Sequence, residues 1–79
     1  MALSQHPTEV VGANVRAEMA RRRMLQGALA EHLHLSQTGV SKRLAGETPF
    51  DINELVAIAR LLEVELCQLL AGVSEDVPA

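Results

Sequence analysis

The chain has 79 residues, 48% of them hydrophobic, and Phe50 is its single aromatic residue. A chain of this length has room for one domain with a modest core, which argues against a large catalytic cleft. No apolar run approaches the roughly 20 residues that cross a bilayer, and the first residues lack the pattern of a signal peptide. We therefore expect one cytoplasmic domain over residues 1–79, ordered from about 8 to 72.

The net charge of −3 is unevenly distributed along the chain. Residues 1–43 carry six Lys and Arg against three acids, whereas residues 44–79 carry one Arg against seven acids. This asymmetry is typical of a protein with one face directed at an anion, but two solvated faces of opposite sign give the same pattern. The run Arg21, Arg22 and Arg23 is open to two similar interpretations, a phosphate contact or a solvated helix end.

Residues able to do covalent or metal chemistry are few. Cys67 is the single cysteine, so it has no partner for an internal disulfide or a shared metal, which fits a reducing compartment. His32 and His34 are close in sequence but have no third ligand nearby. Cys67 also has no base beside it in sequence. We therefore predict no catalytic residue, no metal site, no cofactor and no small-molecule substrate.

The first two helices are predicted from apolar spacing. The first begins at Thr8, which can serve as its N-cap, and ends near Arg23. Its apolar residues recur every four positions on one stripe: Val11, Val15 and Met19. The second helix covers residues 26–33, and its inward face holds Leu29, Ala30 and Leu33.

A turn around His34 separates the second helix from a third, for which Ser36 is a good N-cap. Val40 and Leu44 lie four residues apart and anchor the inner face of this third helix. Its other face is polar and able to form hydrogen bonds, and it holds Gln37, Thr38, Ser41 and Lys42.

The clearest local signal is Asp51 followed three residues later by Glu54, which is a capping box. Phe50 and Leu55 can form the accompanying hydrophobic staple. The fourth helix then runs to about residue 62, with a buried stripe of Ile52, Leu55, Val56, Ala59 and Leu62. Leu66, Leu69 and Leu70 mark a short fifth helix that Gly72 ends. The predicted fold class is all-α, a compact bundle of about five short helices.

Two stretches of the sequence carry a family resemblance. The first reads Gln26-x-x-Leu29-Ala30-x-x-Leu33, a turn, then Ser36-Gln37-x-x-Val40-Ser41-x-x-Leu44-x-Gly46. The second reads Glu54-Leu55-x-x-Ile58-Ala59-x-x-Leu62-x-Val64. The chain resembles the lambda-repressor/Cro-like (XRE-type) helix-turn-helix family over roughly residues 11–72, with the helix-turn-helix at about 26–45. Residues 14–22 and 40–44 further resemble small actinobacterial or actinophage regulators.

The resemblance implies a sequence-specific transcriptional regulator of double-stranded DNA, a repressor that binds its operator as a homodimer. The helix over residues 37–45 is expected to enter the major groove, where Gln can pair with adenine and Lys with guanine. The expected base-reading residues are Gln37, Thr38, Ser41 and Lys42. The expected phosphate-binding residues are Gln26, Ser36 and Arg43.

A protein-interaction module is the alternative from another functional class. In that interpretation an antitoxin-like or antirepressor domain binds a partner through the acidic second half of the chain. A steep fall of duplex affinity with rising salt distinguishes DNA binding from this alternative.

The chain departs from the family pattern in its turn and at one cap. His34 stands where Gly is common because the backbone there becomes left-handed. Leu25 stands where a Ser or Thr cap is common, and its side chain cannot cap the second helix.

Two further departures occur together. On the first helix, many relatives have an apolar residue followed by Arg, where this chain has Glu18 followed by Met19. On the third helix, they often have an apolar residue followed by Glu, where this chain has Arg43 followed by Leu44. We therefore predict that Met19 contacts Leu44 in the core. We also predict that Glu18 lies within salt-bridge reach of Arg43.

Overall fold

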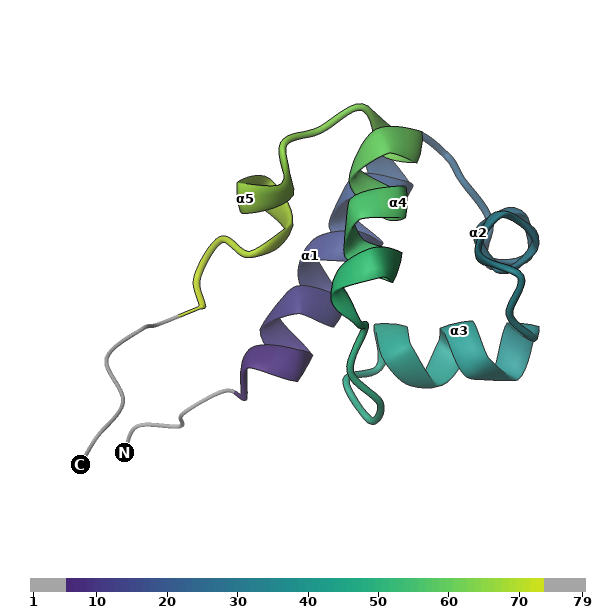
Figure 1. Cartoon of the computed structure of the whole chain (residues 1–79), viewed down its shortest axis with the longest axis horizontal. Helices are drawn as coiled ribbons and strands as arrows, with labels where there is room; N and C mark the ends of the chain where they lie inside the picture. Colours follow the sequence, from purple (N-terminus) through teal and green to yellow (C-terminus); the bar gives the residue numbers. More distant parts are fainter. Residues whose placement is uncertain (1–5, 74–79) are drawn as a thin grey trace.

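The apolar periodicity of the chain produces five α-helices in the computed structural model, which describes residues 6–73 (Figure 1). Their bounds are α1 (Pro7–Arg21), α2 (Gln26–Leu33), α3 (Gln37–Leu44), α4 (Ile52–Leu62) and α5 (Leu66–Leu69). No strand occurs in this part of the chain, so the predicted all-α fold is confirmed. The short helix α5 lies on one side of α1 and α4, and the pair α2 and α3 lies on the other (Figure 1).

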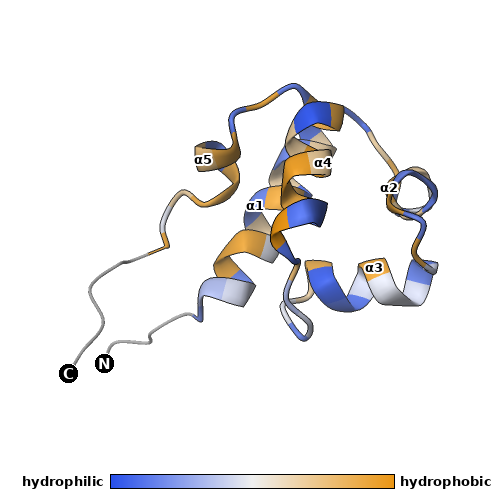
Figure 2. Cartoon of the chain, viewed as in Figure 1, coloured by the Kyte–Doolittle hydropathy of each residue, from blue (hydrophilic) through white to orange (hydrophobic). Residues whose placement is uncertain are grey.

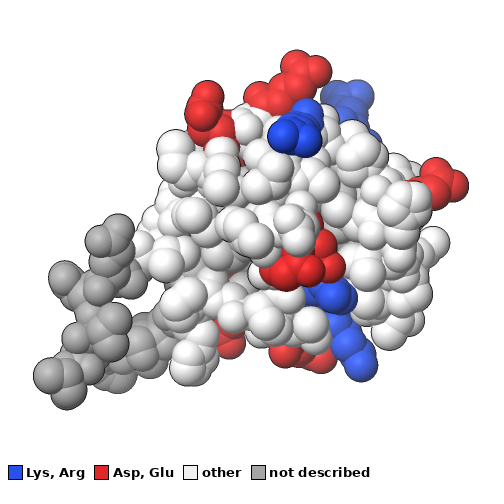
Figure 3. All heavy atoms as spheres, in the orientation of Figure 1, with Lys and Arg blue, Asp and Glu red and all other residues white. Residues whose placement is uncertain are grey.

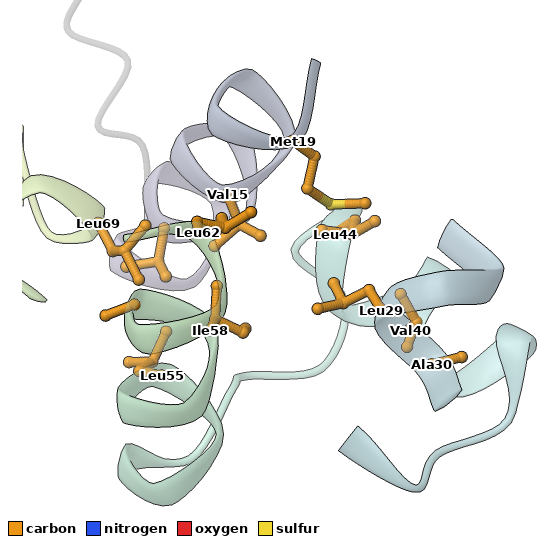
Figure 4. Packing of buried hydrophobic residues seen from close by; sticks show 12 residues of the cluster. Val15, Met19, Leu29, Ala30, Val40, Leu44, Leu55, Ile58, Leu62 and Leu69 are labelled. Carbon is orange, nitrogen blue, oxygen red and sulfur yellow. The ribbon is translucent and has the colours of Figure 1, made fainter. Parts of the chain in front are cut away.

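One cluster of buried apolar side chains joins all five helices (Figure 4). Its members are Val11, Val15, Met19, Leu29, Ala30, Val40, Leu44, Leu55, Ile58, Ala59, Leu62 and Leu69. The predicted stripe of α4 is wrong at Ile52, which is 59% exposed, and it omitted Ile58, which is fully buried. Ile52 is the first residue of α4, and its side chain lies at the end of the helix, outside the buried core.

The ends of α1 differ from the prediction. Thr8 is not the cap, because the helix begins at Pro7 and its N-cap residue is His6, which makes no side-chain capping bond. Proline suits the first helical position because its missing N–H would have had no partner inside the helix. At the other end α1 stops at Arg21, and Arg23 takes a left-handed backbone with φ 54°.

Gly12 allows α1 to lie directly on the C-terminal end of α3. A Cβ atom at this position would be 2.7 Å from the carbonyl oxygen of Leu44 and 2.8 Å from that of Arg43. Gly46, with φ 84°, makes a similar approach, because a Cβ there would be 2.8 Å from the Cα of Glu9. Both approaches involve backbone atoms, so no side-chain rotation can make room for a larger residue.

Asn14 holds the C-terminal end of α5 against α1. Its Nδ2 donates to the carbonyl oxygens of Leu69 at 2.9 Å and Ala71 at 2.7 Å. The first carbonyl belongs to the last residue of α5 and the second lies two residues beyond it, so neither has an acceptor role inside the helix. The helix α5 ends earlier than predicted, at Leu69 with Leu70 as its C-cap residue, and Gly72 follows in the left-handed region with φ 87°.

The capping box of α4 is present as predicted. The Asp51 Oδ1 accepts from the backbone N–H of Glu54 at 2.7 Å, and the Glu54 Oε1 accepts from the N–H of Asp51 at 3.0 Å. Two N–H groups at the start of α4 are therefore satisfied by side chains of the same turn.

Replacing Gly12 with Ala should lower the free energy of unfolding by about 1–3 kcal/mol, because the added methyl group overpacks a backbone contact. This loss should appear although Ala favours a helix interior by about 1 kcal/mol over Gly. Gly27→Ala is the matched control, since a Cβ there meets only the end of the Gln37 side chain, at 3.3 Å. Urea unfolding of both variants checks this, and a Gly12→Ala variant as stable as the parent would contradict the packing described.

Replacing Asp51 with Ala should cost roughly 0.5–2 kcal/mol of stability, because an N–H group at the start of α4 loses its acceptor. Thermal unfolding followed by circular dichroism measures the change. Asn53→Ala serves as the control, since Asn53 is exposed in the same turn of α4. Equal midpoints for the two variants would show that the cap does not stabilise α4.

Candidate nucleic-acid interface

The outward face of α3 is polar and exposed. The helix buries Val40 and Leu44, which are 0% and 2% exposed, and Figure 2 shows it mainly in the blue and white of polar residues. The opposite face consists of four exposed residues, Gln37, Thr38, Ser41 and Lys42. The structure therefore brings the four predicted base-reading residues together on one helix face.

The turn between α2 and α3 forms with His34 in place of a glycine. His34 has φ 59° and ψ 40°, the left-handed conformation that its position predicted. The N–H of Leu35 donates to the carbonyl of Ala30 at 2.9 Å, which closes the turn. Ser36 then caps α3 as predicted, because its Oγ accepts from the N–H of Gly39 at 2.9 Å.

The N-terminus of α2 opens onto a hollow of about 800 Å³. Leu25 is the N-cap residue and makes no side-chain capping bond, as expected. Gln26 and Gln37 both line the hollow, and the Gln37 amide lies 3.3 Å from where a Cβ of Gly27 would be. The start of α2 and the start of α3 therefore face the same space.

The end of α1 adds two arginines to this hollow. Arg22 is paired with Glu18, whereas Arg23 is exposed and makes no ion pair with another residue of the described part of the chain. The left-handed backbone of Arg23 sets the direction of the chain just before α2. In the sequence, only the run of three arginines indicated that these residues could contact an anion.

The predicted ion pair between Glu18 and Arg43 is wrong. The Glu18 carboxylate accepts instead from Arg21 and Arg22, each at 2.6 Å, which are its neighbours three and four residues along the same helix. Glu18 lines a second hollow together with Gln68 of α5, so it lies on the side of α1 that faces α5. Arg43 lies on α3, across the molecule from that side.

The predicted contact between Met19 and Leu44 agrees with the structure. Met19 and Leu44 are 4% and 2% exposed and belong to the one core cluster. Figure 4 shows the end of the Met19 side chain next to that of Leu44. Adjacent residues on α1 thus face different neighbours, Met19 toward α3 and Glu18 toward α5.

Arg43 is held within the fold. Its Nε donates to Glu54 Oε1 at 3.1 Å, and its Nη1 donates to the carbonyl of Gly39 at 3.0 Å. Its side chain is only 19% exposed. Of the three predicted phosphate-binding residues, Gln26 and Ser36 are exposed, whereas Arg43 is half-buried and uses two of its five N–H donors inside the fold.

Positive charge forms no continuous patch on the face seen in Figure 3. Lys and Arg atoms reach the surface over α3, and acidic side chains border them on both sides. Further Lys and Arg atoms lie at the opposite edge of this face (Figure 3), so positive charge occurs in separate groups, and the attraction of each for an anion falls off within about 10 Å in moderate salt.

Three further observations concern residues 6–73. No group of three or more His, Cys, Asp or Glu residues gathers there in a way that could hold a metal ion. No helix there combines the length and the apolar character that crossing a membrane requires. Cys67 is exposed on α5.

Comparison with known proteins agrees with the arrangement of α2 and α3. The sequence matches the model of the helix-turn-helix family over residues 15–69. The chain belongs to this family, in its XRE or Cro/C1-type branch, whose members are DNA-binding domains of transcription regulators. The narrower resemblance to actinobacterial or actinophage regulators stays a prediction. A search of curated protein sequences found no significant match.

Three crystal structures share the fold. The clp gene regulator ClgR from C. glutamicum has a TM-score of 0.78 at 17% identity, covering 92% of this chain and 100% of that one. The hypothetical transcription factor NHTF from Neisseria has a TM-score of 0.74 at 24% identity, covering 89% and 83%. The restriction-modification controller protein C.AhdI from Aeromonas hydrophila has a TM-score of 0.71 at 19% identity, covering 78% and 94%.

Proposed function

We propose that the protein is a sequence-specific transcriptional repressor that reads the major groove of duplex DNA with α3. The observation that carries the proposal is the exposed polar face of α3 on a helix whose other face is fully buried. A major groove about 12 Å wide accepts such a helix, and its side chains can then reach base edges. A repressor acts through this binding alone, because occupancy of an operator excludes other proteins from it.

The residues on this face have the hydrogen-bonding groups that base recognition needs. Gln37, at the first position of α3, can donate to and accept from one adenine. Lys42 can donate to the O6 and N7 atoms of guanine, and Thr38 and Ser41 can bond either kind of base or contact a thymine methyl group. We assign base reading to these four residues.

The hollow at the start of α2 suits a DNA phosphate. The first N–H groups of α2 point out of the helix without a side-chain cap, and the helix dipole favours an anion there. Gln26 and the exposed Arg23 lie beside them. Ser36 can also donate, because its Oγ uses only an acceptor site in capping α3. We assign backbone contacts to Gln26, Ser36 and Arg23, and not to Arg43, whose side chain is 19% exposed and bonded to Glu54 and to the Gly39 carbonyl.

A homodimer is the form in which such a domain reads a palindromic site, with one copy on each half-site. Of the apolar residues near the C-terminal end, Leu66 and Val73 pack against the core and Leu70 is 37% exposed. A dimer surface there would therefore centre on Leu70.

Replacing Gln37 with Ala should cost about 1–3 kcal/mol of binding free energy on the preferred duplex and should relax the preference at one base pair. The preferred duplex comes from selection out of a random pool, and fluorescence anisotropy on single-base-pair variants gives the preference. Gln26→Ala is the contrast, since loss of a phosphate contact weakens all duplexes alike. Equal weakening of every duplex by Gln37→Ala would remove it from the base-reading residues.

Duplex affinity should fall linearly on a plot of log affinity against log salt, because phosphate binding releases counterions. Arg23→Ala should reduce the magnitude of that slope by about 1. Arg16→Ala is the control, since Arg16 is an exposed arginine of α1 that does not line the hollow. A parent protein without measurable, salt-sensitive duplex binding would favour the interaction module built on the acidic half of the chain.

A further inference from the structure

We propose that Arg43 and Glu54 form a positioning link that sets the orientation of α3 and thereby the base selectivity of the protein. The inference rests on the proposed function, because its main readout is selectivity among duplexes. It assigns Arg43 a role inside the fold in place of a direct contact with DNA phosphate.

The guanidinium of Arg43 joins two helices. Its Nε donates to Glu54 Oε1 at 3.1 Å in the first turn of α4, and its Nη1 donates to the Gly39 carbonyl of α3 at 3.0 Å. The two charged side chains are 19% and 15% exposed, so solvent has little access to them. A planar guanidinium with two directed bonds fixes an angle, which a lysine ammonium at the same place cannot do.

The same carboxylate oxygen also completes the cap of α4. Glu54 Oε1 accepts from the Asp51 N–H at 3.0 Å while it accepts from Arg43. A carboxylate oxygen can accept more than one hydrogen bond, so the two functions do not compete. The start of α4 and the body of α3 are therefore tied to one atom, across the loop that contains Gly46.

Gly39 leaves room for this link on the surface of α3. A Cβ at Gly39 would be 3.4 Å from Arg43 Nη1 and 3.2 Å from Ser36 Oγ. The guanidinium thus lies beside the N-terminal turn of α3, one turn back from its own Cα, as helical side chains tend to do. It lies in the same turn as the base-reading Gln37 and Thr38.

Other contacts hold α3 along its inner stripe and at its C-terminal end. Val40 and Leu44 are buried in the core, and the carbonyls of Arg43 and Leu44 lie against Gly12 of α1. Neither contact fixes the side of α3 that faces α4. The link from Arg43 to Glu54 restrains that side against rotation of the helix. Because base contacts require correct placement within a fraction of an ångström, a small rotation should reduce selectivity more than it reduces folding stability.

The test compares Arg43→Gln, Arg43→Lys, Glu54→Gln and the double variant Arg43→Gln/Glu54→Gln in the full chain. The readout is the ratio of affinities for the preferred duplex and its single-base-pair variants, measured where circular dichroism shows each variant folded. Each Gln variant should lower this ratio by about tenfold, and the double variant should lose no more than either single one, because both remove the same link. Arg43→Lys should rescue only part of the ratio, since it keeps the charge without the directed bonds.

Salt dependence separates positioning from phosphate contact. A phosphate ligand at Arg43 would give a slope lower by about 1 in Arg43→Gln, whereas a positioning residue leaves the slope unchanged. Glu47→Gln is the matched control, because it removes an exposed negative charge just beyond α3 that is not in the link. It should keep the parent's ratio.

A selective parent protein whose ratio survives in all four variants, or whose Arg43→Gln variant loses slope and affinity equally on every duplex, would overturn the inference and leave the proposed function standing. A parent protein that binds no duplex selectively would overturn both. Should Glu54→Gln fail to fold, Arg43→Gln and Arg43→Lys still decide the matter, because they leave the cap of α4 intact.

Discussion

The arrangement of this domain depends on the contact between α1 and the C-terminal end of α3 at Gly12. The backbone carbonyls of Arg43 and Leu44 lie where any side chain at position 12 would have to go. This close approach brings Leu44 under the apolar stripe of α1, next to Met19. It therefore determines which side of α3 is buried, and the polar side is outward as a consequence.

Besides that contact, different interactions hold the start, the inner face and the C-terminal part of α3. The Ser36 cap and the left-handed His34 define its start, Val40 and Leu44 hold its inner stripe, and Arg43 bonds to the first turn of α4. A helix restrained in this way holds the backbone of its outer residues in one position. Preorganised contacts of this kind favour selective recognition, because less ordering entropy is lost on binding.

The charge distribution also favours recognition through a few directed contacts over attraction by a broad positive surface. The net charge is −3, and basic side chains near α3 are bordered by acids. A broad positive surface would attract any duplex, whereas under the proposed function affinity comes from a few contacts on α3 and at the start of α2. The fold is shared at 17–24% identity, so the helix arrangement tolerates wide change in sequence.

Sequence alone determined the features that depend on neighbours along the chain: the bounds of α2, the caps at Ser36 and Asp51, and the polar face of α3. Only the tertiary structure decided the partner of Arg43. It has several acidic candidates, and its pairing with Glu54 depends on how α3 is rotated against α4. The pairing of Glu18 with Arg21 and Arg22 is instead local, because these residues lie three and four positions along the same helix. What holds for Arg43 also holds for Asn14, whose acceptors are backbone carbonyls 55 and 57 residues away and carry no signal in the sequence. These choices follow from helix packing, which the contact at Gly12 constrains and which local sequence patterns do not encode.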